Sequence, residues 1–223
     1  MDHLSNPEYQ KKLYELLKFY DADLQELIDL ATIACDGNRP KNLENEIYSV
    51  FHHICRSVFH KNDVQDACEE IETAINSHLV RVQSDAYKIT LDRTLERAVN
   101  CIKNYELLLL DRDFRDVLPD AITLFQKIRR TYKDTKNAYC EAKRYERIGD
   151  RPKTVERYNN ALKGVPILDA MIEDFEDDGR FSIALLSVKK KARSEKRRMW
   201  IVLIGAVISG LGGLATLLGF LPR

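Results

Sequence analysis

Apolar residues recur at intervals of three and four along most of the chain, the spacing that places side chains on one face of an α-helix. Asn6 is a favourable helix cap, and Pro7 is tolerated in a first helical turn. The first predicted helix runs from about Pro7 to Ala34, with the recurring residues Leu13, Leu16, Leu17, Tyr20, Leu24, Leu27 and Ile28. A turn over Asp36-Gly37-Asn38 should end it.

Two more helices are predicted in the first half of the chain. The second runs from about Pro40 to Phe59, with the inner residues Leu43, Ile47, Val50, Phe51, Ile54, Cys55 and Val58. The third, from about Asp63 to Leu110, contains no Gly or Pro and repeats apolar residues every seven positions at Cys68, Ile75, Val82 and Ile89. Beyond Ile89 the register changes to Leu91, Leu95, Ala98, Ile102, Tyr105 and Leu109. Such a change indicates two successive packing partners or a stutter in a coiled coil.

Proline and glycine separate the remaining helices. A fourth helix is predicted from Pro119 to about Ile148, with Ile122, Phe125, Ile128, Tyr132, Tyr139 and Tyr145. After a turn at residues 149–152, another helical stretch should break or kink at Gly164-Val165-Pro166. There is no strand pattern. The sequence therefore predicts an all-α fold, a bundle of long antiparallel helices.

The C-terminal segment from Trp200 to Leu221 contains 22 residues without a charge. At ~1.5 Å per residue this is roughly 33 Å of helix, enough for a bilayer core of about 30 Å. The alternative is a buried core helix. We expect a single transmembrane helix at residues 200–221, preceded by an amphipathic basic neck at 181–199 and a helical bundle at 1–180.

Charge is separated along the chain, although basic and acidic residues number 35 each. Residues 1–188 contain 27 basic and 34 acidic residues, and such an acidic body argues against a general nucleic-acid surface. Because basic residues are retained on the cytoplasmic side, we expect a single-pass protein of the inner (cell) membrane with its N-terminus in the cytoplasm. The predicted membrane-interface residues are Lys189, Lys190, Lys191, Arg193, Lys196, Arg197, Arg198 and Trp200. The basic residues would attract anionic lipid, and the Trp200 ring would lie at the level of the lipid headgroups.

Small residues form a stripe in the predicted span. Gly205, Ser209 and Gly213 recur at every fourth position, and Gly212 and Thr216 lie beside them. Such a stripe lets two helix backbones approach closely, so it predicts a homo-oligomer packed through this face. The alternative is that glycine is simply common in membrane helices.

No sequence motif indicates an enzyme, and we expect no catalytic residue, cofactor or small-molecule substrate. His52, His53, Cys55, His60, Cys68 and His78 lie near one another in the sequence, but without a zinc-site spacing. We therefore expect no metal site, with Cys55 and Cys68 in the core and the histidines at helix edges. The isolated cysteines suit a reducing compartment.

The stretch ENEIYSVFHHICRSVFH and the long helix after it, from Glu44 to Tyr87, resemble helical nucleases of the HEPN superfamily. The resemblance implies an RNA-cleaving pair formed by Arg56 and His60. Only three residues separate the two, fewer than the family pattern has.

The whole architecture, an acidic helical body with one glycine-rich terminal span, resembles small membrane effectors of bacterial antiphage systems, including retron-associated ones. The resemblance implies a body held silent by a cytosolic protein or ribonucleoprotein partner. On release the protein would oligomerise through the span and perturb the inner membrane, as in abortive infection. A constitutive membrane tether or scaffold that recruits a cytosolic partner is the alternative, and a membrane-bound HEPN-like ribonuclease is a third.

Overall fold

The computed structural model describes residues 2–109, 119–177, 179–197 and 199, and all regular structure among them is helical. Residues 179–197 are helical throughout. The elements before them are η1 (Asp2–Ser5), α1 (Pro7–Phe19), η2 (Tyr20–Leu24), α2 (Gln25–Ala34), α3 (Lys41–Phe59), α4 (Val64–Thr73), η3 (Ala74–Leu79), α5 (Val80–Leu109), α7 (Pro119–Arg147), α8 (Arg151–Leu162) and α9 (Val165–Asp177). η1 is a 3₁₀ turn, whereas η2 and η3 are π-helical. The predicted all-α class is confirmed.

The helix starts follow the local signals in the sequence. Asn6 Oδ1 accepts a hydrogen bond from the backbone N–H of Glu8 at 2.9 Å and caps α1. Asp63 caps α4 and Asp150 caps α8 in the same way. Each cap satisfies amide groups that have no partner inside the helix. The predicted interruption near Gly164 is also present, because α8 ends at Leu162 and α9 begins at Val165.

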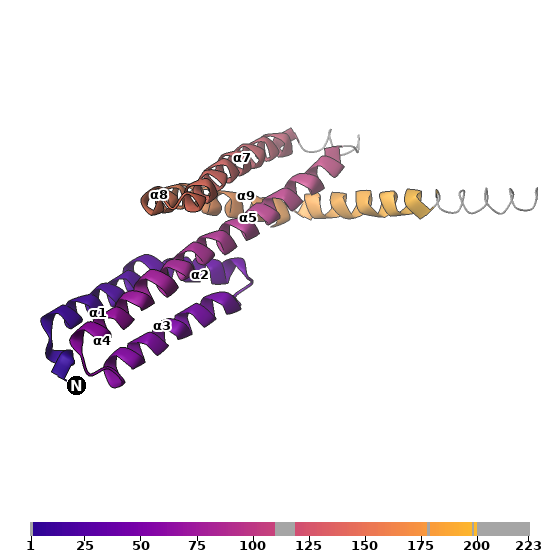
Figure 1. Cartoon of the computed structure of the whole chain (residues 1–223). Coiled ribbons are helices and arrows are strands. Elements are labelled where there is room, and N and C mark those ends of the chain that lie inside the picture. Colours follow the sequence, from indigo (N-terminus) through magenta and orange to yellow (C-terminus); the bar gives the residue numbers. More distant parts are fainter. Residues whose placement is uncertain (1, 110–118, 178, 198, 200–223) are drawn as a thin grey trace, which may run out of the picture. The chain divides into compact units, whose positions relative to one another are not determined.

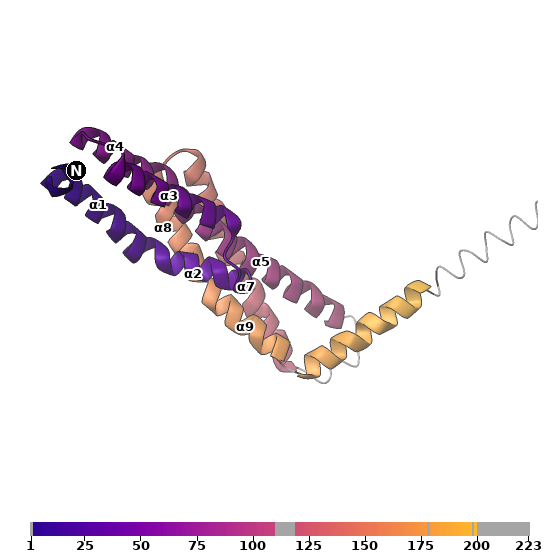
Figure 2. The same cartoon turned by 90° about the horizontal axis from the view of Figure 1, so that it is seen from below.

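The chain divides into two compact units, and the first comprises Met1–Val99 with Ile128–Ala170. In this unit α4 and η3 contact α3, and α4 also contacts α1, so these helices run side by side (Figures 1 and 2). The Tyr9 hydroxyl on α1 and the Ser57 hydroxyl on α3 share a buried hydrogen bond of 2.9 Å. The most deeply buried aliphatic side chains of the unit include Leu16, Leu24, Ile28, Leu43, Ile71, Leu79 and Leu91.

The π-helical turn η3 sets the register of the long third helix. Ala74 and Leu79 are five residues apart and both are fully buried, which fits the i to i+5 geometry of a π-turn. The register change therefore lies at residues 74–79. The sequence pattern predicts it beyond Ile89, and that prediction is wrong. Ile75 and Ile89 are only partly buried, whereas the predicted core positions Leu91, Leu95 and Ala98 are buried.

The predicted inner face of α3 is wrong at two positions. Phe51 is 58% exposed and Cys55 is exposed. The core face follows Leu43, Ile47 and Val50, and a residue one position further along a helix points about 100° away from its neighbour. Phe51 therefore points to solvent although it follows a core residue. Leu17 and Ile122, also predicted as inner residues, are 53% and 41% exposed.

The second unit comprises Asn100–Lys127 with Met171–Arg223 and has an aromatic core. The Tyr105 ring is stacked on the Phe125 ring, with centroids 4.3 Å apart. Phe175 lies 6.1 Å from Tyr105 and 4.5 Å from Phe181, again between ring centroids. Burial of Phe181 therefore ties the start of the helix at 179–197 to this core.

None of the helices in the described ranges is long and apolar enough to cross a membrane. The predicted transmembrane helix at residues 200–221 lies outside the described residues.

Candidate functional site

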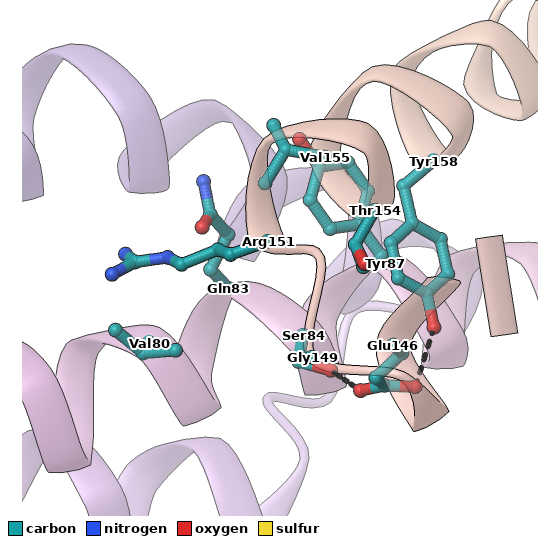
Figure 3. Close-up of a pocket in the computed structure, with 10 residues that line it drawn as sticks. All are labelled: Val80, Gln83, Ser84, Tyr87, Glu146, Gly149, Arg151, Thr154, Val155 and Tyr158. Atoms are coloured by element: carbon teal, nitrogen blue, oxygen red, sulfur yellow. Dashed lines mark hydrogen bonds between the residues drawn. The ribbon is translucent and has the colours of Figure 1, made fainter. Parts of the chain in front are cut away.

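The first unit contains a cavity of about 180 Å³ between α5 and α8, at the turn that joins α7 to α8 (Figure 3). We call it the α5–α8 cavity. Most of its lining surface is apolar, and the residues come from three helices and one turn. They are Val80, Gln83, Ser84 and Tyr87 of α5, Glu146 of α7, Gly149 of the turn, and Arg151, Thr154, Val155 and Tyr158 of α8.

Local sequence builds the α8 wall of this cavity. Gly149 has a φ of +75°, a conformation that glycine adopts at little cost, and it ends α7. Asp150 Oδ1 then accepts a hydrogen bond from the Lys153 amide at 3.2 Å, and the Thr154 hydroxyl donates to the Asp150 carbonyl at 2.7 Å. These bonds fix the first turn of α8, so that Val155 and Tyr158 line the cavity.

Two stacked tyrosines line the cavity. The rings of Tyr87 and Tyr158 are stacked with centroids 4.9 Å apart and planes within 7° of parallel. The Tyr87 hydroxyl donates to Asn159 Oδ1 at 2.6 Å. Burial raises the pKa of Tyr87 to about 12, and burial together with the nearby Glu146 carboxylate raises the pKa of Tyr158. Both phenols are therefore neutral hydrogen-bond donors at pH 7.

Glu146 is held by three donors. Its carboxylate accepts hydrogen bonds from the Ser84 hydroxyl at 2.5 Å and the Tyr158 hydroxyl at 3.1 Å (Figure 3). Lys88 Nζ lies 2.7 Å from the same carboxylate. Burial acts to raise the pKa of Glu146, but the bonds from Lys88 and Ser84 outweigh it and lower the pKa. A carboxylate with a lowered pKa is a weak base, so Glu146 is poorly suited to activate Ser84 as a nucleophile. The arrangement suits binding better than catalysis.

Two polar side chains of the cavity keep unused donors. Within the described residues Arg151 forms no salt bridge, and its guanidinium carbon lies 5.9 Å from the Phe19 ring centroid. Gln83 is only 8% exposed, and its amide has no hydrogen-bond partner in that part of the chain. In Figure 3 the Arg151 and Gln83 side chains extend to the Val80 end of the cavity, away from Glu146.

A second polar cluster lies between α3 and α4, around Glu70. The Glu70 carboxylate lies 2.6 Å from His53 Nδ1, 3.2 Å from Arg56 and 3.3 Å from Lys61. His78 belongs to the π-turn η3, and its Nδ1 lies 2.6 Å from the Glu46 carboxylate. The ring centroids of His78 and His53 are 5.1 Å apart.

This cluster contains one member of the pair that the HEPN resemblance implies. Arg56 is engaged with Glu70, and His60 is an exposed residue at the end of α3. His52 is exposed, and Cys68 is buried as predicted, whereas Cys55 is not. No group of three or more His, Cys, Asp or Glu side chains among the described residues is arranged to hold a metal ion.

The predicted membrane-interface residues that the structure describes are all exposed on the helix at 179–197. They are Lys189, Lys190, Lys191, Arg193, Lys196 and Arg197. Arg198, Trp200 and the predicted packing residues Gly205, Ser209, Gly212, Gly213 and Thr216 lie outside the described residues.

Sequence reasoning did not find the α5–α8 cavity. Tyr87, Glu146 and Tyr158 are distant in sequence and form no motif, so only their helix periodicity is visible before folding. Comparisons of the chain with protein-family models, with curated proteins and with solved structures find no match.

Proposed function

We propose that this protein is a membrane-anchored helical effector. Residues 200–221 hold a cytoplasmic helical body to the inner membrane, and release from a cytosolic partner lets the span self-associate and perturb the membrane. One observation carries the proposal: an exposed basic helix at 179–197 is followed, after Arg198 and Met199, by 22 residues without a charge.

The basic helix supports the anchoring step. Each Lys or Arg close to an anionic membrane surface contributes about 1 kcal/mol of attraction, and six exposed Lys or Arg residues lie at positions 189–197 of this helix. Because residues 179–197 are helical and not a flexible linker, movement of the body can be transmitted toward the span.

An exposed aromatic stripe on α3 supports the partner-binding step. Tyr48, Phe51 and Phe59 are 71%, 58% and 65% exposed. Their spacing of three and eight residues places them on one face of α3, with the exposed Cys55 between them. Exposed aromatic side chains gathered in this way favour a protein interface. We call this set the α3 aromatic stripe.

Growth and membrane potential of a bacterium that expresses the full-length chain test the proposal. We expect growth arrest with depolarisation, and the pair Ser209→Leu with Gly213→Leu should abolish both by blocking close helix packing. The control is Ala215→Leu, which lies on the other side of a helix from Gly213 and should leave both effects. Depolarisation that persists in the paired variant would refute packing through the stripe. Normal growth and potential without an inhibitor present would favour the tether.

The same assay separates the effector from a ribonuclease. A nuclease would lose toxicity in Arg56→Ala and His60→Ala while the membrane potential stayed intact in the wild type. We expect both variants to remain toxic, since Arg56 pairs with Glu70 and His60 is an exposed helix-end residue.

A further inference from the structure

The α5–α8 cavity is large enough for one small apolar group. Its volume is about 180 Å³. A dry apolar cavity of roughly 150 Å³ holds benzene, whereas pockets for drug-sized ligands and cofactors are about 300–1,000 Å³. A nucleotide therefore does not fit, but a single aromatic ring or branched aliphatic group does.

The charged and polar side chains of the lining indicate which polar group the ligand carries. Glu146 already accepts bonds from Ser84, Lys88 and Tyr158, so it is not available to pair with a ligand cation. Arg151 is the one basic side chain in the lining, and the amide of Gln83 has no hydrogen-bond partner within the described residues. The Gln83 amide atoms are not among the buried unpaired polar atoms, so a ligand oxygen that accepts a hydrogen bond from this amide would take the place of solvent.

The start of α8 narrows the choice of anion. Asp150 already occupies the Lys153 amide with its side chain, and its carbonyl accepts the Thr154 amide. The backbone amides that would cradle a phosphate at a helix N-terminus are therefore taken. The guanidinium of Arg151 is therefore the donor left for an anion at the start of α8. It is planar, and its two parallel donors match a carboxylate.

We propose that the α5–α8 cavity binds a small carboxylate with an apolar, ring-sized body. The carboxylate pairs with Arg151 and accepts a hydrogen bond from Gln83, while the body lies against Val80, Val155 and the Tyr87 ring. The site is independent of the membrane-anchoring proposal, since every residue in it belongs to the first unit.

Calorimetric titration of the full-length chain in a mild detergent at pH 7 tests the site, with phenylacetate as the probe. Phenylacetamide lacks the charge and acetate lacks the ring. We expect saturable one-to-one binding of phenylacetate, and binding at least about tenfold weaker for each of the other two, because each lacks one of the two recognised parts. Absence of saturable phenylacetate binding would overturn the proposal.

Two variants test the pairing with Arg151 and the fit of the apolar body in the cavity. Arg151→Gln should weaken phenylacetate binding about tenfold, since a charged hydrogen-bonded pair is lost, and leave phenylacetamide unchanged. Arg147→Gln, a basic residue at the end of α7 outside the lining, is the matched control and should bind as wild type. Equal affinity of wild type and Arg151→Gln for phenylacetate would refute the site. Val155→Phe should fill the cavity and abolish binding, with circular dichroism to verify that this variant is folded.

The carboxylate could belong to a free metabolite or to the C-terminal residue of a peptide. A short peptide that ends in phenylalanine, compared with its C-terminal amide, separates the two sources. Tighter binding of the free-acid peptide than of phenylacetate assigns a peptide terminus, and weaker binding assigns a small molecule.

Discussion

Tyr158 on α8 is fully buried against Tyr87 on α5, with the two rings stacked at a centroid distance of 4.9 Å. The two tyrosines are 71 positions apart in the sequence (158 − 87). The Tyr158 hydroxyl also donates a hydrogen bond to Glu146 on α7. Tyr158 therefore connects three helices of the first unit, and replacing it should lower the free energy of unfolding.

Tyr158→Ala is expected to lower the free energy of unfolding by about 3–5 kcal/mol, because it empties a large buried volume. Tyr158→Phe keeps the ring and should cost only about 1 kcal/mol for the lost hydrogen bond. Urea denaturation followed by circular dichroism measures both. Tyr48→Ala, at a 71% exposed position on α3, serves as the control and should stay within about 0.5 kcal/mol of wild type. Equal losses in the three variants would contradict the packing described.

Glu70 should make stability depend on pH. Burial acts to raise its pKa, but hydrogen bonds with His53 and Lys61 and the charge of Arg56 lower it overall. A carboxyl whose pKa is lower in the folded chain stabilises the fold above its ordinary pKa of about 4.3, and this contribution is lost as the pH falls through the folded value. Wild type should therefore lose stability in acid.

Glu70→Gln tests this dependence. At pH 7 the variant should be less stable by about 1–3 kcal/mol, because three cationic or polar neighbours lose their charged partner. The difference from wild type should shrink between pH 5 and pH 3, as measured by urea midpoints. The exposed neighbour Glu69 provides the control, and Glu69→Gln should keep the wild-type profile. A gap between Glu70→Gln and wild type that is constant with pH would argue against the ionised Glu70.

Gly164 is required by close packing. A Cβ atom at this position would overlap Oγ1 of Thr135 on α7, and Thr135 is buried. Gly164→Ala should therefore destabilise the chain by about 1–3 kcal/mol through overpacking. Gly179→Ala is the control, since nothing lies within 4 Å of its added Cβ. Thermal unfolding compares the two, and a Gly164→Ala variant as stable as Gly179→Ala would contradict the close approach.

The orientation of α3 can be tested with two substitutions. Leu43→Ala removes a fully buried side chain and should cost about 2–5 kcal/mol in the free energy of unfolding. Phe51→Ala removes a larger but exposed side chain and should change stability by less than about 0.5 kcal/mol. Urea denaturation gives both values. A larger loss for Phe51→Ala would place the α3 aromatic stripe in the core instead of at the surface.

Much of the helical architecture was predictable because helix ends are decided locally. Asn6 and Asp150 satisfy amides within three residues of themselves, so their effect is visible in the sequence. The turn at Gly149 likewise needs only a residue that tolerates a positive φ. The separation of charge between body and basic neck is also a property of the sequence alone.

Periodicity was less informative about which face of a helix is buried. α3 carries apolar residues on two faces, and only its packing against α4 and η3 shows that Phe51 and Cys55 lie outside the core. The register of the long third helix changes at the π-turn η3, whose hydrogen bonds span one more residue than those of an α-helix. The seven-residue repeat in the sequence predicts this change after Ile89. Only the burial of Ala74 and Leu79 shows where it lies.

The sequence by itself determined the helical class, the capped helix starts and the order of an acidic body, a basic helix and an uncharged terminal segment, since each depends on neighbouring residues or on composition. The tertiary structure decided which side chains meet. Ser84, Lys88 and Tyr158 converge on Glu146, and His53, Arg56 and Lys61 converge on Glu70. Such convergence depends on how helices pack across gaps of many residues, and those distances do not exist in the unfolded chain.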